Sequence, residues 1–180
     1  MLFQNHPDRY SQLQMNKLIL ETIIEALKFI FPAYCANAAP VIFGGGLPLD
    51  RGKKFMDGKP IFGENKTLRG FISGLIVGTI VGFAEHALFK YPVAFGFITA
   101  LGALIGDLFE SFIKRRLGKK PGEVLPLADQ LDFVLGALAF SLLVMPPKIE
   151  VFLTVLIITP PIHLATNYLA YLLKLKKNPF

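Results

Sequence analysis

The chain has a single cysteine among its 180 residues, and several common functional motifs are missing from it. Cys35 cannot form an internal disulfide, and the chain has no Cys/His cluster of the kind that binds zinc. The spacing GxxxxGK[ST] does not occur, so there is no P-loop. The sequence shows no soluble domain with a basic patch and aromatic residues that could stack on bases, so nucleic-acid binding is not expected. These absences exclude disulfide-rich, zinc-binding and P-loop proteins.

Long apolar blocks dominate what is present. Hydrophobic residues make up 53% of the chain, and the mean hydropathy is +0.51. About 20 consecutive apolar residues cross the hydrocarbon core of a bilayer. We therefore predict an all-α integral membrane protein with about five transmembrane helices, forming a single domain over residues 1–180. The predicted spans are residues 18–43, 70–89, 92–113, 128–146 and 151–175.

The positive charges predict an orientation for these spans. Of the 19 lysines and arginines, 14 lie in residues 44–69, 114–120 and 174–177. Because cytoplasmic loops carry an excess of Lys and Arg, both loops and the C-terminus are expected in the cytoplasm, with the N-terminus outside. The polar segment Met1–Gln14 is followed by no cleavage-site pattern, so no signal peptide is expected.

One short polar segment, residues 107–132, stands between two apolar blocks and carries five cations and five carboxylates. Asp107, Ser111 and Lys114 are spaced to share one face of a helix, and Asp129 and Asp132 share a face of the next. A carboxylate at the C-terminal end of a membrane helix is unfavourable both for the helix dipole and for desolvation. Asp107 is therefore a candidate functional residue.

Carboxylate oxygens are the ligands that Mg²⁺ prefers. The pattern predicts a Mg²⁺ site formed by Asp107, Asp129 and Asp132, and it leaves open a second cation. A structural alternative exists for the later pair, in which Asp129 is a helix N-cap and Asp132 the third residue after it, both complementing the helix dipole.

The segment GENKTLRG at residues 63–70 is the second candidate for phosphate binding. Asn65 and Thr67 offer neutral hydrogen bonds, Lys66 offers a point charge, and Arg69 can grip a phosphate with two bonds. An anchoring loop whose cations rest on lipid headgroups explains the same residues equally well.

Some intramembrane residues have a packing interpretation. Gly74, Gly78 and Gly82 recur every four residues, a spacing that lets two helix backbones approach closely. His163, Thr166 and Asn167 are expected to form polar contacts between helices or to line a cavity. The pair Pro160-Pro161 predicts a kink in the last span.

The motifs together resemble a known family. Ser111-Phe-Ile-Lys114-Arg115, followed by Lys120-Pro-Gly, Pro126 and Asp129-Gln-Leu-Asp132, is similar to the signature of the CTP-dependent phosphatidate cytidylyltransferase superfamily. The chain departs from it at Pro121, where the signature has Asp, at Gln130, where it has Arg, and in lacking His-Gly-Gly. These departures and the loop at residues 44–69 resemble the archaeal branch, CDP-archaeol synthase.

The resemblance implies a Mg²⁺-dependent enzyme of membrane phospholipid synthesis that transfers CMP from CTP to an unsaturated archaetidic acid and releases pyrophosphate. Its partners are CTP, a lipid phosphate and the cell membrane, with the active site on the cytoplasmic side. The oligomeric state is left open. Asp132, Asp107 and Lys114 are the expected catalytic residues, and Asp107, Asp129 and Asp132 the expected metal ligands. The expected nucleotide- or phosphate-binding residues are Asn65, Lys66, Thr67, Arg69, Ser111, Arg115 and Asp129.

Two alternative functions are kept. A CDP-diacylglycerol synthase acting on phosphatidate would share the chemistry and differ in the lipid. A small membrane transporter would use the intramembrane Asp107, but the chain has no evident internal repeats, and its polar residues gather on one face instead of crossing the midplane.

Overall fold

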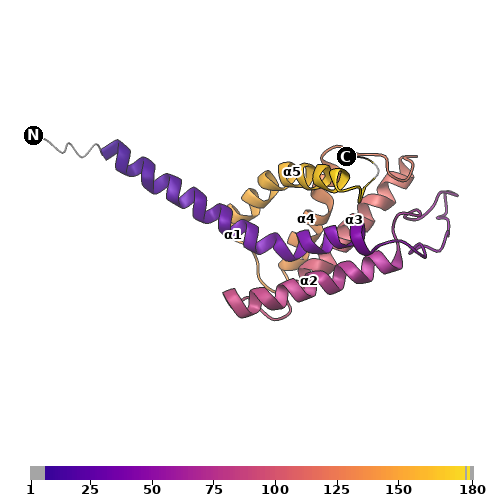
Figure 1. The fold of residues 1–180 in the computed structure, drawn as a ribbon, viewed down its shortest axis with the longest axis horizontal. Helices are drawn as coiled ribbons and strands as arrows, with labels where there is room; N and C mark the ends of the chain where they lie inside the picture. The colour runs from indigo at the N-terminus through magenta and orange to yellow at the C-terminus, as the bar shows by residue number, and fades with distance from the viewer. Residues whose placement is uncertain (1–6, 177, 179–180) are drawn as a thin grey trace, which may run out of the picture.

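Five α-helices follow one another along the chain in the computed structural model, which describes residues 7–176 and 178 (Figure 1). They are α1 (Pro7–Phe43), α2 (Leu68–Phe89), α3 (Phe95–Arg116), α4 (Ala128–Ser141) and α5 (Ile149–Leu172). Within the described residues there is no β-strand, only isolated bridges between Pro48 and Thr67 and between Lys54 and Pro60. The predicted all-α class is therefore confirmed.

Three of the described helices, α2, α3 and α5, are long and apolar enough to cross a membrane, with 22, 22 and 24 residues. The helix α4 has 14 residues, which correspond to about 21 Å of rise and fall short of a full crossing. Membrane crossing by α1 and α4 stays a prediction.

The helix boundaries differ from the predicted spans. The helix α1 begins at Pro7 instead of residue 18, because polar residues before the apolar block also adopt helix and a proline suits the first helical turn. The helix α3 continues to Arg116 rather than 113. The helix α4 ends at Ser141 rather than 146, where tight turn bonds precede the prolines at 146 and 147 that disfavour helix.

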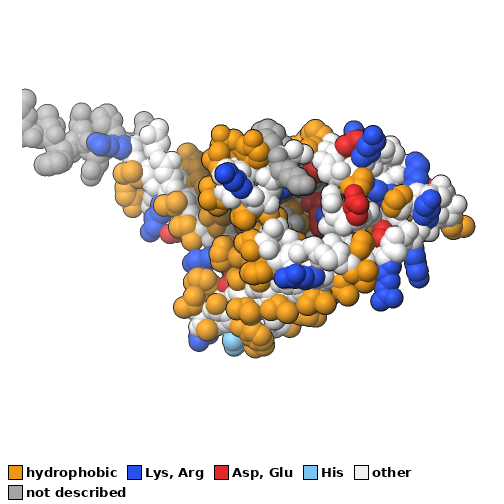
Figure 2. Space-filling view, turned by 45° about the vertical axis from the view of Figure 1, so that its right-hand side comes forward, with side chains coloured by type: hydrophobic (Ala, Val, Ile, Leu, Met, Phe, Trp, Pro, Cys, Tyr) orange, Lys and Arg blue, Asp and Glu red, His pale blue; other side chains and the backbone are white. Residues whose placement is uncertain are grey.

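Apolar side chains cover the flanks of the helices, whereas charged side chains gather at one end of the bundle (Figure 2). Leu143, Ile157 and Leu88 are 75%, 73% and 71% exposed. Large contiguous apolar surface is rare on soluble monomers. The exposed flanks are therefore the surface expected to face lipid.

The buried core lies between four helices. Phe29 and Ile30 of α1 pack with Phe95 of α3, Phe133 of α4 and Val155 of α5. The rings of Phe29 and Phe95 meet edge to face, with their centroids 5.0 Å apart. The hydroxyl groups of Tyr34 and Thr159 lie 2.8 Å apart and add a polar contact between α1 and α5.

The glycines of α2 allow close helix packing, as the sequence predicted. A Cβ atom on Gly82 would lie 2.2 Å from Cα of Gly96 in α3. A Cβ atom on Gly74 would lie 2.6 Å from the carbonyl oxygen of Ala36 in α1. The backbone of α2 thus touches both neighbours directly at these positions.

The backbones of α3 and α4 also touch, and this contact positions residues at the polar end of the bundle. A Cβ atom on Gly106 would lie 2.2 Å from the carbonyl oxygen of Asp132, and one on Gly136 would lie 2.1 Å from that of Gly102. Backbone contact at Gly106 brings the next residue of α3, Asp107, to the N-terminal turns of α4. These two contacts position the acidic residues described below.

Replacing Gly82 with Ala should separate α2 from α3, because the added methyl group meets backbone that cannot rotate away. We expect a loss of about 1–3 kcal/mol of stability, seen as a lower Tm in detergent. Ile80→Ala is the matched control, since Ile80 is 61% exposed on the lipid-facing side of the same helix and should be nearly neutral. An equal loss in both variants would contradict the packing role of Gly82.

Candidate functional site

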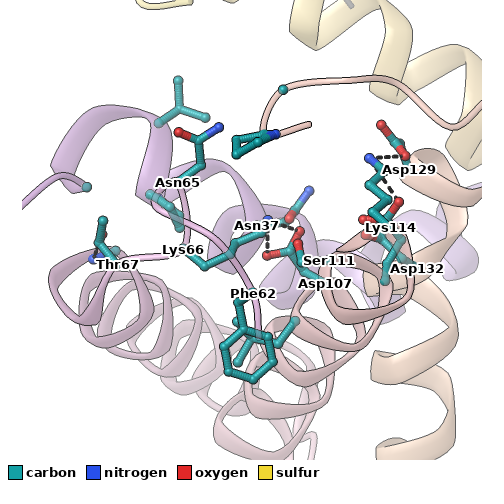
Figure 3. A pocket seen from close by; sticks show the side chains of 18 of the residues that line it. Asn37, Phe62, Asn65, Lys66, Thr67, Asp107, Ser111, Lys114, Asp129 and Asp132 are labelled. Atoms are coloured by element: carbon teal, nitrogen blue, oxygen red, sulfur yellow. Dashed lines mark hydrogen bonds and ion pairs between the residues drawn. The ribbon is translucent and has the colours of Figure 1, made fainter. Parts of the chain in front are cut away.

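A cavity of about 720 Å³ opens at the charged end of the bundle, where α2 and α4 begin and α1, α3 and α5 end (Figure 3). Residues from all five helices and from the loop between α1 and α2 line it. The sequence-predicted residues on its lining are Asn65, Lys66, Thr67, Asp107, Ser111, Lys114, Arg115, Asp129 and Asp132. The structure therefore brings nine of the ten predicted residues to one cavity.

The exception is Arg69, which lies in the first turn of α2, is exposed and does not line the cavity. Thr67 lines the cavity, but it is buried and acts as the N-cap of α2, its hydroxyl oxygen accepting a 3.1 Å hydrogen bond from the amide of Gly70. Once Thr67 fixes the helix start, Arg69 projects from the helix surface. Phosphate binding by Arg69 therefore stays a prediction.

The loop before α2, residues 44–67, is an ordered series of turns. The carboxylate of Asp50 organises it by accepting 2.9 Å hydrogen bonds from the amides of Gly52, Phe62 and Gly63. Burial acts to raise the pKa of Asp50, but these amide bonds outweigh it and lower the pKa. Asp50 is therefore an anionic anchor at neutral pH.

A second anchor ties this loop to the end of α3. The guanidinium of Arg116 lies 5.1 Å from the ring of Phe55 in the loop and 4.7 Å from that of Phe112 in α3. Arg116 also pairs with Asp57 at 3.1 Å, and its backbone carbonyl accepts a 2.7 Å bond from Lys59. No role was assigned to Asp50 or Arg116 from the sequence, because Asp50 binds amides later in its own folded loop and Arg116 contacts a loop that lies far away in the sequence.

The contacts of Asp50 and Arg116 hold the loop so that Lys66 lines the cavity. Its ammonium donates to both carboxylate oxygens of Asp107, at 2.6 and 2.7 Å (Figure 3). Burial acts to lower the pKa of Lys66, but Asp107, with smaller contributions from Asp132 and Glu110, outweighs it and raises the pKa. Lys66 therefore stays charged at neutral pH and sits among several carboxylates.

Lys114 forms a second cluster on the neighbouring side of the cavity. Its ammonium lies 2.9 Å from Glu110 and 2.5 Å from Asp129 (Figure 3). Asp129 also accepts a 3.1 Å bond from the amide of Leu125. The alternative in which Asp129 caps α4 is wrong, because Leu127 occupies the cap position with a φ of 65° and Asp129 lies inside the first turn.

Arg115 is buried next to this cluster, with its side chain under Gly63 of the loop. One guanidinium nitrogen donates to the carbonyl of Lys120 at 3.2 Å. Its Nε and Nη1 atoms are buried and have no hydrogen-bond partner among the described residues. Unsatisfied buried donors on a charged group are costly, so these atoms are well suited to an anionic ligand. Ser111 is also buried on the cavity lining.

The far wall of the cavity comes from α5 and the chain after it. His163, Asn167 and Lys176 all line it, and Lys176 donates a 2.9 Å hydrogen bond to the amide oxygen of Asn167. The prediction for His163 and Asn167 left open cavity lining, which the structure confirms. Thr166 instead is exposed and bonds its own helix backbone. No sequence pattern pointed to Lys176, or to Asn37 of α1, which also lines the cavity.

The predicted metal site formed by Asp107, Asp129 and Asp132 stays a prediction. Within the described residues, no group of three or more Asp, Glu, His or Cys side chains is arranged to hold a metal ion. Asp129 instead forms an ion pair with Lys114 at 2.5 Å. Mg²⁺ is nevertheless often bound by one or two carboxylates together with substrate phosphates. Asp107 and Asp132 line the same cavity as an oxygen-only pair, so they fit that mode of binding.

The comparisons with known proteins agree with this geometry. Residues 18–180 match the family model described as CarS-like: CDP-archaeol synthase. The chain is 46% identical to the CDP-archaeol synthase of Pyrococcus furiosus, over 89% of this chain and 100% of that protein. It is 45% identical to the CDP-archaeol synthase of Methanococcoides burtonii, over 84% of this chain and 100% of that protein.

A solved structure also resembles this one. It is described as "Structural insight into an intramembrane enzyme for archaeal membrane lipids biosynthesis". The match has a TM-score of 0.76 and 39% sequence identity, and it covers 81% of this chain and 94% of the other. A membrane enzyme therefore shares this fold.

The order of the loop at residues 44–67 should depend on the charge of Asp50. Since folding lowers the pKa of Asp50, its stabilisation is fully present above the unfolded pKa and is lost as the pH falls through the folded pKa. We expect limited proteolysis of the loop to accelerate over that acidic range. Asp50→Asn should be cleaved rapidly at neutral pH as well. Glu64→Gln, an exposed carboxylate in the same loop, is the control and should keep the wild-type profile.

Proposed function

The chain belongs to the CDP-archaeol synthase family, and we propose that its cavity transfers the CMP group of CTP to an unsaturated archaetidic acid. The lipid substrate is 2,3-bis-O-geranylgeranyl-glycerol 1-phosphate, and the products are the CDP-activated lipid and pyrophosphate. The observation that carries the proposal is the cavity itself, in which Lys66, Lys114 and Arg115 meet Asp107 and Asp132 at the charged end of an apolar helix bundle.

Arg115 is the strongest candidate for binding the triphosphate, because two of its buried nitrogens lack a partner among the described residues. Lys66 and Lys114 are held at the cavity by carboxylates. When a polyphosphate enters, both ammonium groups can exchange a carboxylate oxygen for a phosphate oxygen within the same region. Asn65 and Ser111 add neutral hydrogen-bonding groups on the lining.

Mg²⁺ is the proposed cofactor, and a second cation stays open. Asp107 and Asp132 are the proposed ligands. When bound, Mg²⁺ supplies charge neutralisation for the triphosphate. Asp132 is suited to this because one of its oxygens already accepts a 2.6 Å bond from the amide of Phe133, which fixes the carboxylate. Lys66 stays beside Asp107 and limits the repulsion between the two carboxylates.

The reaction is a substitution at the α-phosphorus of CTP. A phosphate oxygen of the lipid forms a new P–O bond to that phosphorus, the bond to the bridging oxygen of the β-phosphate breaks, and pyrophosphate leaves with the electron pair. The nucleophile is already anionic, so no strong base is required. The protein must hold two anions in line and stabilise the spreading negative charge, and the cations of the cavity supply this.

The lipid is proposed to enter from the bilayer. Val41 of α1 and Leu164 of α5 give the cavity an apolar border, and both side chains are partly exposed at 38%. The concentration of Lys and Arg in residues 44–69 and 114–120 supports a cytoplasmic location for the cavity and an outer N-terminus. CTP would then reach the site from the cytoplasm.

Purified protein should form a radioactive lipid from α-labelled CTP, Mg²⁺ and the geranylgeranyl ether phosphate. Phosphatidate with two acyl chains should be the poorer substrate by kcat/KM. The opposite preference would favour the CDP-diacylglycerol synthase alternative. If neither lipid gives a CTP-dependent product, the proposed function is wrong. Substrate flux into liposomes without CTP would favour a transporter.

Asp132→Asn should lower kcat by about 100-fold or more, because it removes a charge that balances the cation beside the triphosphate. The amide oxygen can still accept from Phe133, so the variant should purify with a wild-type Tm. Activity should vanish with EDTA and return with Mg²⁺ in the wild type. Glu150→Gln, in the first turn of α5 and far along that helix from the cavity, is the control and should be fully active. Wild-type rates in Asp132→Asn would remove this residue from the site.

A further inference from the structure

One group of polar residues on the cavity has no part in the chemistry described so far. We call it the α5 wall, and it consists of His163, Asn167 and Lys176. The amide oxygen of Asn167 accepts a 2.9 Å hydrogen bond from Lys176, and its amide nitrogen lies 3.3 Å from Nδ1 of His163. The ring of His163 stacks at a tilt on Phe133 of α4, with the centroids 5.9 Å apart. These contacts position an ammonium group on the lining of the cavity.

Lys176 differs from the other lysines of the cavity in its partners. Lys66 and Lys114 each contact a carboxylate at 2.9 Å or less. Among the described residues, no carboxylate lies within ion-pair distance of Lys176, and its ammonium donates to the neutral amide of Asn167. A partly buried cation held by a neutral group is free to pair with an incoming anion.

The electrostatic surroundings of Lys176 agree with a missing anion. Burial lowers the pKa of Lys176, Asp129 acts to raise it, and the nearby Lys66 and Lys114 each lower it by a smaller amount. An anion placed between these three ammonium groups would relieve their repulsion. During the proposed reaction the cavity holds two anions, the triphosphate of CTP and the phosphate of the lipid. The proposed function assigns Arg115, Lys114 and Lys66 to the triphosphate.

The lining around Lys176 is suited to a phosphate that carries apolar chains. Leu164 and Leu175 flank the α5 wall on the cavity. Beyond them, Tyr168, Leu169 and Leu172 of α5 are more than half exposed, at 51%, 55% and 56%. This side of the cavity therefore joins the surface expected to face lipid, whereas the loop side is polar.

We propose that Lys176, positioned by Asn167 and His163, binds the phosphate monoester of the lipid substrate and holds it opposite the α-phosphorus of CTP. The inference rests on the proposed function, since it assigns the second of that reaction's two anions to a subsite. It also gives the chain after α5 a function, as part of the lipid-binding wall.

The test compares Lys176→Gln with Lys174→Gln. Lys174 is exposed, lies two residues away and does not line the cavity, so its variant loses the same charge from the same tail. In mixed micelles, Lys176→Gln should raise KM for the geranylgeranyl ether phosphate about 10- to 100-fold, as expected for loss of a hydrogen bond to a charged group. KM for CTP should stay within about twofold by the same reasoning. Lys174→Gln should leave both values unchanged, and Lys176→Arg should restore most of the lipid affinity.

A binding measurement without turnover completes the test. The lipid phosphate alone should raise the Tm of the wild type and of Lys174→Gln, and much less that of Lys176→Gln, while the shift caused by CTP with Mg²⁺ should be equal in all three. A rise in KM for CTP alone would assign Lys176 to the triphosphate, and unchanged lipid binding would overturn the subsite. Either result leaves the proposed function intact, because that function is tested by the activity and the lipid preference of the wild-type protein.

Discussion

The contact between the backbones of α3 and α4 is the constraint on which the cavity depends. A side chain on Gly106 would collide with the carbonyl oxygen of Asp132, so the two helices meet without any side chain between them. Asp107 follows Gly106 directly and is thereby held beside the start of α4. Packing between the two helices keeps the carboxylates of Asp107 and Asp132 close, although like charges repel. Cations from other segments, such as Lys66 beside Asp107, reduce that repulsion.

Those cations come from three separate parts of the chain, and different contacts hold each part in place. Asp50 and Arg116 fix the loop that carries Lys66, the helix α3 carries Lys114 and Arg115, and Asn167 holds Lys176. Before substrate binds, carboxylates neutralise two of these lysines. The site is thus ready for anions without leaving a large unpaired charge at the membrane boundary, where an unpaired charge is costly.

The sequence predicted much of this. Apolar blocks indicated the helices, the GxxxG spacing indicated close packing by α2, and the charge pattern indicated which segments meet at one end. It could not specify roles that depend on three-dimensional partners. Arg69 and Asp129 have the residue types and spacing of ligands, but the sequence did not show that Arg69 is exposed in the first turn of α2 or that Asp129 pairs with Lys114. Asp50, Arg116 and Lys176 had no local signal, because their roles depend on how the loop at residues 44–67 folds and on where the chain after α5 lies.

The sequence by itself determined that the chain is helical and membrane-embedded, which family it resembles, and that carboxylates and cations concentrate near its polar segments. These properties follow from composition and local spacing. Only the tertiary structure decided which carboxylate faces which cation, because those pairings depend on helix contacts such as Gly106 against Asp132 and on a loop folded around Asp50. It also decided that the chain after α5 returns to the cavity, since one lysine in a basic tail looks like any other until its neighbours are known.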